Sequence, residues 1–187
     1  MGGPGHNNGP ALEPGKGWHR HCWSQARKDL LPTLPIEIVR LRVRRAAEIG
    51  LDYRTYASIR ATSGHDVIAL LFSTNALRLL TQNAALPPDR RAVLSAITNT
   101  GRGVLAQSPL TPRDVLAQCA TLIDHATPAP RPFDPWSQIR HGVLAGLKAR
   151  NWPADQVLMI GDTAFEAEWA QAARMAGYLP AERFFAA

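Results

Sequence analysis

Two acidic residues close together in sequence follow an apolar run near the C-terminus. Asp162 and Glu166 come after the residues VLMIG (157–161). If a helix starts there, the two carboxylates lie about one turn apart and can hold a magnesium ion together with water and a substrate phosphate. Acids at a helix start also stabilise it by about 0.3–1 kcal/mol without any metal. Both alternatives, a magnesium site and a helix start, stay open at this stage.

Polar residues also follow two other apolar runs. Ser73 and Asn75 stand at the end of HDVIALLFSTN (65–75), and Thr98 lies within RRAVLSAITNTGRG (90–103). The carboxyl ends of parallel strands meet at one edge of a sheet, where ligands bind. If these runs are strands, Ser73, Asn75, Thr98 and Asp162 line one ligand-binding pocket. The first run also fits a long buried helix, because periodicity cannot distinguish the two.

The order of the segments predicts the fold class. The apolar runs alternate with helical patterns at 111–126 and 134–151. Strands that alternate with helices favour a parallel sheet covered by helices. We therefore expect an α/β fold, a small parallel sheet flanked by helices, with an α-helical N-terminal segment. The expected organisation is a disordered Gly/Pro-rich tail (1–17), a basic helical segment (18–64) and an α/β domain (65–187).

The motif order over residues 66–178 resembles that of the haloacid dehalogenase superfamily. Its members are largely phosphohydrolases with a doubly wound sheet, an aspartate nucleophile and a magnesium ion. The resemblance makes Asp162 and Glu166 the metal-binding acids and Thr98 the residue that hydrogen-bonds the phosphoryl group.

The chain departs from this family at the first motif. Ser73 stands in place of the nucleophilic Asp and Asn75 in place of the general acid. A Ser hydroxyl without a base is a weak nucleophile, and an amide cannot transfer protons. For the family's phosphate-binding Lys, Arg131 or Arg140 would have to substitute. The resemblance implies a domain that binds a phosphorylated or anionic small molecule with little or no catalysis, and leaves open whether the chain is an enzyme.

The N-terminal third carries most of the net charge of +6, with ten Lys and Arg against five Asp and Glu in residues 1–65. Two helical patterns there, at 35–50 and 53–64, are joined at Gly50 with the spacing of a helix-turn-helix unit. In this alternative the chain is a DNA-binding regulator. Arg40, Arg44, Arg54 and Arg60 then contact the nucleic acid. An ordinary helical hairpin produces the same pattern.

The remaining expectations concern compartment and protein partners. No apolar run reaches the roughly 18–20 residues of a membrane span, and no secretory signal stands at the N-terminus. A cytoplasmic protein without membrane association is therefore expected. A third alternative is an adaptor that contacts another protein through its basic helices and its aromatic C-terminus, Phe184 and Phe185.

Overall fold

The structure is a computed structural model that describes residues 34–82, 84–119 and 121–186. Two compact units make up the chain, Met1–Val39 and Arg40–Ala187. The predicted tail at 1–17 and the first part of the basic segment, up to residue 33, lie outside the described residues. The sheet and every candidate site below lie in the second unit.

Helices and strands alternate along the chain after an initial pair of helices. In chain order the described elements are α2 (Ile36–Glu48), α3 (Tyr53–Ser63), β1 (Ala69–Ser73), α4 (Pro88–Ala96), β2 (Gly101–Ala106), α5 (Pro112–Cys119), β3 (His125–Pro128), α6 (Trp136–Lys148), the short 3₁₀ helix η1 (Ala154–Gln156), β4 (Val157–Gly161), α7 (Ala164–Ala173), β5 (Gly177–Pro180) and α8 (Ala181–Phe185). No helix among the described residues is long and apolar enough to cross a membrane.

The five strands form one parallel sheet in the order β3-β2-β1-β4-β5. This order confirms the predicted α/β fold class. The chain moves outward from β1 in one direction through β2 and β3, and then returns to the other side of β1 with β4. The order therefore reverses between β1 and β4, and in such sheets ligands bind near this point, beyond the carboxyl ends of the strands.

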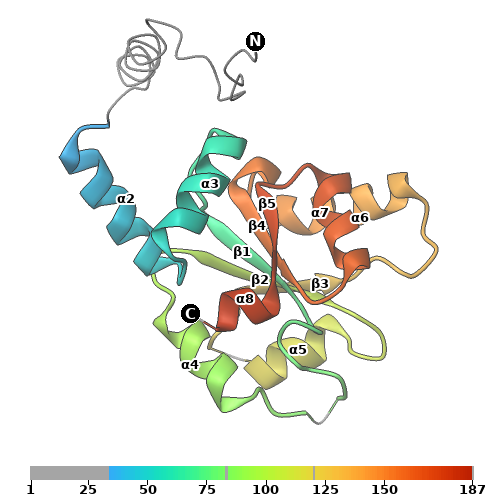
Figure 1. Ribbon diagram of the computed structural model, residues 1–187. Helices are drawn as coiled ribbons and strands as arrows, with labels where there is room; N and C mark the ends of the chain where they lie inside the picture. Colours follow the sequence, from blue (N-terminus) through green and yellow to red (C-terminus); the bar gives the residue numbers. More distant parts are fainter. Residues whose placement is uncertain (1–33, 83, 120, 187) are drawn as a thin grey trace, which may run out of the picture. The chain divides into compact units, whose positions relative to one another are not determined.

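Alternating residues of the central strands supply two separate cores, one on each face of the sheet. Leu70 and Phe72 of β1 belong to one buried cluster, whereas Ala69 and Leu71 belong to the other. The first cluster includes residues of α3, α4, α5 and α8, and the second includes residues of α6 and α7 (Figure 1). Because both faces are covered, the strands read as continuous apolar runs, as is typical of parallel sheets.

The first of the three predicted strands is confirmed and the second is wrong. Residues 69–73 form β1, which excludes the alternative of a long helix there. Residues 88–96 form α4, and the second strand begins only at Gly101. The physical reason is that Pro87 and Pro88 favour a helix start and Leu94 is buried on one helical face. The apolar run that looked like a strand is thus one side of an amphipathic helix.

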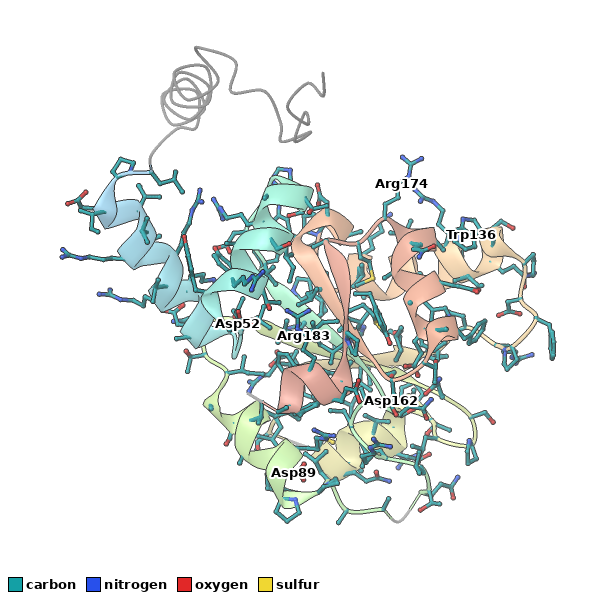
Figure 2. All side chains as sticks on the ribbon, in the orientation of Figure 1. Asp52, Asp89, Trp136, Asp162, Arg174 and Arg183 are labelled. Atoms are coloured by element: carbon teal, nitrogen blue, oxygen red, sulfur yellow. The ribbon has the colours of Figure 1, made fainter. Side chains whose placement is uncertain are left out.

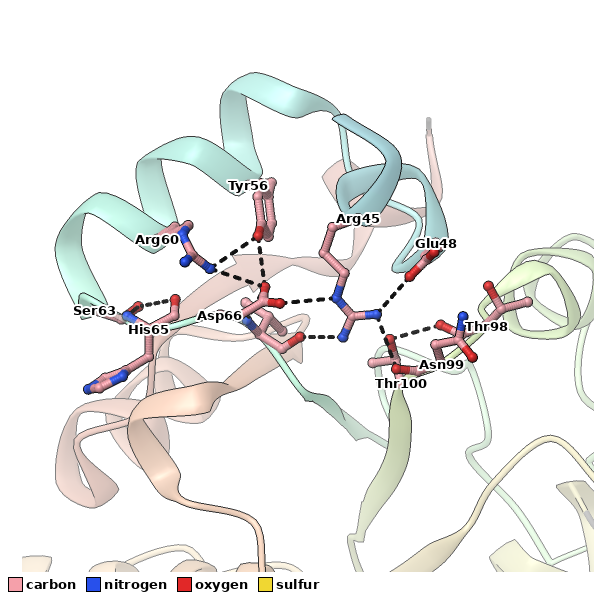
Figure 3. A network of polar contacts seen from close by, with 11 residues as sticks. Arg45, Glu48, Tyr56, Arg60, Ser63, His65, Asp66, Thr98, Asn99 and Thr100 are labelled. Atoms are coloured by element: carbon pink, nitrogen blue, oxygen red, sulfur yellow. Dashed lines mark hydrogen bonds and ion pairs between the residues drawn. The ribbon is translucent and has the colours of Figure 1, made fainter. Parts of the chain in front are cut away.

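Arg45 joins the helical pair to the amino end of the sheet (Figure 3). Its guanidinium donates hydrogen bonds to the Val67 carbonyl at 2.8 Å and to the Asn99 carbonyl at 3.1 Å. It also forms ion pairs with Glu48 at 3.0 Å and with Asp66 at 3.3 Å, and its side chain is only 15% exposed. One side chain of α2 therefore satisfies backbone carbonyls at the amino ends of both β1 and β2.

Replacement of Arg45 by Met should destabilise the protein by about 2–3 kcal/mol, because it removes charged hydrogen bonds from partly buried carbonyls. Urea unfolding followed by circular dichroism measures this difference. The matched control is Arg44→Met on the same helix, whose exposed side chain should change the free energy of unfolding by less than about 0.5 kcal/mol. Equal effects of the two substitutions would contradict a structural role for Arg45.

Candidate functional site

A helix starts at the turn between β4 and α7, which is one of the two alternatives that the sequence left open for Asp162 and Glu166. Thr163 is the N-cap, and its side chain accepts a hydrogen bond from the Glu166 N–H. The Glu166 side chain in turn accepts from the Thr163 N–H, which completes a capping box. Asp162 precedes the cap. A larger residue at position 161 would force its neighbours to shift, since a Cβ on Gly161 would lie 2.6 Å from Tyr178 Cε2 and 2.8 Å from Glu166 Oε2.

Glu166 is completely buried, and N–H donors surround its carboxylate. Oε1 accepts hydrogen bonds from the Asn75 side-chain amide at 2.9 Å and from the Gln107 side-chain amide at 3.0 Å. Oε2 accepts from the backbone N–H groups of Asp162 and Thr163. A carboxylate has about four acceptor positions, so these donors fill it. We call Asn75, Gln107, Asp162 and Thr163, which supply these four N–H groups, the amide cage.

Asp162 faces a different environment. It follows β4 at the carboxyl edge of the sheet (Figure 2), and its Oδ2 lies 3.4 Å from Arg78 Nη1. Its side chain is 26% exposed. The neighbouring Tyr178 hydroxyl donates to the Thr163 carbonyl at 3.1 Å. Burial, and then the negative charges of Glu166 and Asp162, raise the pKa of Tyr178.

The residues at this edge do not fit the magnesium ion that the family resemblance implies. Magnesium needs oxygen ligands in a near-octahedral array. Both oxygens of Glu166 already accept N–H groups, and a cation bound there would face those N–H groups at close range. Across the described parts of the chain, no three His, Cys, Asp or Glu side chains are grouped so that they could hold a metal.

Ser73 and Asn75 lie together at the end of β1, but only Asn75 reaches the predicted pocket. Ser73 is completely buried, and its hydroxyl accepts a hydrogen bond from the Ala76 N–H at 3.0 Å. Its role is to close the turn after β1. Asn75 lines a cavity at the carboxyl edge and binds Glu166 across the sheet. The structure thus brings Asn75, Asp162 and Glu166 together.

The predicted position of Thr98 at a strand's carboxyl end is wrong. Thr98 precedes β2, is exposed, and donates its backbone N–H to the Glu48 carbonyl at 2.9 Å. It therefore lies at the opposite edge of the sheet from Asp162. The residues that follow β2 at the carboxyl edge are Gln107 and Ser108. The sequence pattern that could have identified these two residues is the apolar run VLA (104–106), followed by a polar pair and a proline.

A cavity of about 470 Å³ opens at the carboxyl ends of β1, β2 and β3. Its polar lining consists of Asn75, Gln107, Ser108, Thr111 and Arg131. Its apolar walls include Leu110, Phe165 and prolines from the loops after β2 and β3. Among the described lining residues, Arg131 is the charged one. Arg140, the other candidate for an anion-binding cation, instead donates to the Ala172 carbonyl at 2.9 Å.

A second cavity, of about 520 Å³, runs along α6. Its described lining comes from that single helix, including Arg140, His141 and Lys148. One helix face does not surround a ligand, and none of the described lining residues is a polar residue that follows a strand. The cavity at the strand ends is the better candidate, because three loops and the start of α7 supply its lining.

The four arginines of the DNA-binding alternative differ in their exposure and in their contacts. The two helices do meet at Gly50, whose φ is 72°. Arg40, Arg44 and Arg54 are exposed. Arg60 is held between Asp66, at 3.7 Å, and the Tyr56 hydroxyl, at 3.4 Å. Three of the four predicted phosphate contacts are therefore accessible, and the fourth side chain is already paired.

The aromatic C-terminus of the adaptor alternative is packed against the sheet. Phe184 is 1% exposed and stacks edge to face on Phe72, with ring centroids 5.6 Å apart. The Arg90 guanidinium covers the ring of Phe185 at 3.9 Å. Arg183 donates to the Thr55 hydroxyl at 2.8 Å, which fixes α8 to α3. Phe184 thus stabilises the core.

Replacement of Gln107 by Met tests the amide cage. The change preserves side-chain length but removes one N–H donor from Glu166 and the acceptor of the Thr74 hydroxyl. We expect a loss of about 1.5–3 kcal/mol in the free energy of unfolding. Urea unfolding of Gln107→Met is compared with that of Gln171→Met, an exposed position on α7. A loss no greater than that of the control would show that the cage does not stabilise the fold.

The chain was compared with protein-family models, curated proteins and solved structures. No family model matches it, and neither a curated protein nor a solved structure does.

Proposed function

We propose that this protein is a ligand-binding α/β domain related to the haloacid dehalogenase superfamily, and that it binds a small phosphorylated or otherwise anionic molecule with little or no catalysis. The ligand occupies the cavity at the carboxyl edge of the sheet. Its anionic group pairs with Arg131, and its remaining surface contacts the apolar walls.

The cavity itself is the observation that supports binding. It lies beside the point where strand order reverses, which is the usual ligand position in open parallel sheets. Its volume of about 470 Å³ falls within the range of small-molecule sites. Few polar groups and one charged side chain among mostly apolar walls are also typical of such sites. Arg131 can bind a phosphate or carboxylate through two parallel N–H groups.

The state of the two residues at the family's catalytic positions, Ser73 and Asn75, supports the absence of catalysis. Ser73 is buried, and its hydroxyl closes a turn. Asn75 donates its amide N–H to Glu166. A nucleophile must be accessible and activated by a base, and a general acid must carry a transferable proton. Neither side chain meets these requirements.

The test is a thermal-shift screen of the full chain against sugar phosphates and nucleoside monophosphates, with and without magnesium. A ligand present at about 100 times its dissociation constant should stabilise the protein by roughly 2.7 kcal/mol. We expect this rise in melting temperature without magnesium, and its loss in Arg131→Met. A separate arm with short duplex DNA tests the alternative through the arginines of α2 and α3.

Arg54→Met is the matched control for Arg131→Met. Arg54 is exposed on α3 and is one of the arginines of the DNA-binding alternative. The control should bind the small ligand like the unmodified protein. The proposal fails if no phosphorylated compound shifts the melting temperature, or if Arg131→Met binds as tightly as the control. A salt-sensitive shift with DNA, lost in Arg54→Met, would support the alternative instead.

A further inference from the structure

The amide cage has the chemistry of an anion-binding site. It gathers N–H donors from three loops at one point: the loop after β1 supplies Asn75, the loop after β2 supplies Gln107, and the β4–α7 turn supplies two backbone groups. We propose that this cage is an oxyanion site that the chain fills with its own Glu166 carboxylate. A small free carboxylate, such as formate or acetate, will bind there when the Glu166 side chain is shortened.

The Gln107 side chain and the backbone at Asn75 are held in place by contacts other than those with Glu166. The Gln107 carbonyl oxygen accepts a hydrogen bond from the Thr74 hydroxyl at 3.1 Å, and the Gln107 backbone N–H donates to the same hydroxyl at 3.2 Å. Asn75 lies in a turn closed by the bond from the Leu79 N–H to the Thr74 carbonyl, at 2.9 Å. Gln107 therefore has a contact that keeps its position when the carboxylate is removed, and the backbone at Asn75 stays in its turn, which favours binding of a replacement.

A free anion can also reach the cage from outside. Asn75 and Gln107 belong to the lining of the cavity of about 470 Å³, as does Phe165, the residue before Glu166. Shortening Glu166 would join the vacated space to that cavity. This route requires neither Arg131 nor a natural ligand. Binding of formate to the cage can therefore be tested independently of the proposed function.

The cage also accounts for the poor fit of a cation at this edge of the sheet. Glu166 is one of the two acids that the family resemblance assigns to magnesium, and here amide N–H groups satisfy its carboxylate. Asn75, a member of the amide cage, donates an N–H group at the position where the family has its general acid. Its replacement by Asp would bring a second carboxylate to the Glu166 oxygen that now lies 2.9 Å from the Asn75 amide. Two carboxylates at that distance repel each other unless one of them takes up a proton or a cation lies between them.

The first experiment measures the melting temperature of Glu166→Ala in increasing sodium formate or acetate, with sodium chloride at equal ionic strength as reference. We expect a lower melting temperature in chloride and a saturable rise of several degrees in formate. Glu168→Ala, an exposed acid on the same helix, is the matched control and should show neither effect. In the folded variant, formate should also shift the NMR signals of the Asp162 and Thr163 backbone amides.

The second experiment measures the melting temperature of Asn75→Asp with and without magnesium. We expect a decrease without the ion and a recovery with it, whereas the unmodified protein should not respond. This variant keeps Glu166, so it tests the donor character of the cage even if Glu166→Ala does not fold. The proposal is overturned if formate neither restores nor binds to Glu166→Ala. It is equally overturned if magnesium stabilises the unmodified protein through Asp162 and Glu166, or if Asn75→Asp without a cation melts like the unmodified protein at alkaline pH, where protonation no longer relieves the repulsion.

Discussion

Glu166 places a carboxylate in the interior of the protein, and the carboxyl edge of the sheet is arranged around it. An acid that is fully buried must be matched by hydrogen-bond donors, because each hydrogen bond to a charged group contributes about 1.5–3 kcal/mol. Here the donors come from three loops that are distant in sequence, with Gln107 separated from Glu166 by 59 positions. The loops after β1 and β2 and the start of α7 can therefore take only the conformations that direct their N–H groups to this carboxylate.

A second charged side chain fixes the opposite edge. Arg45 donates to carbonyls near the amino ends of β1 and β2, and pairs with Asp66 just before β1. Between these two edges, apolar residues of the central strands fill the two cores. The charged contacts set the positions of the loops and helices at the sheet ends, while burial of apolar surface supplies most of the stabilisation. The cavity lies beside the fixed carboxyl edge, so Asn75 and Gln107 of its polar lining are held in place before any ligand binds.

Some parts of this arrangement could be predicted from the sequence, and physical reasons explain the rest. The buried strands β1 and β4 are continuous apolar runs, and the start of α7 carries its own capping box, so local pattern is sufficient for them. Thr98 was misplaced because one side of α4 has the apolar density of a strand, whereas β2 begins with Gly-Arg-Gly. Those glycines fit under Trp152, a contact that no local pattern contains. The pairing of Arg60 with Asp66, and of Glu166 with two amides, is likewise a product of the tertiary fold.

The central claim is that N–H donors, and not a metal ion, satisfy Glu166. The most direct measurement is a crystal structure of the full chain grown in manganese(II), a magnesium substitute with a measurable anomalous signal. We expect no anomalous peak between Asp162 and Glu166, with the amide nitrogens of Asn75 and Gln107 within hydrogen-bond distance of the carboxylate. A manganese ion bound to both acids, with those amides turned away, would contradict it.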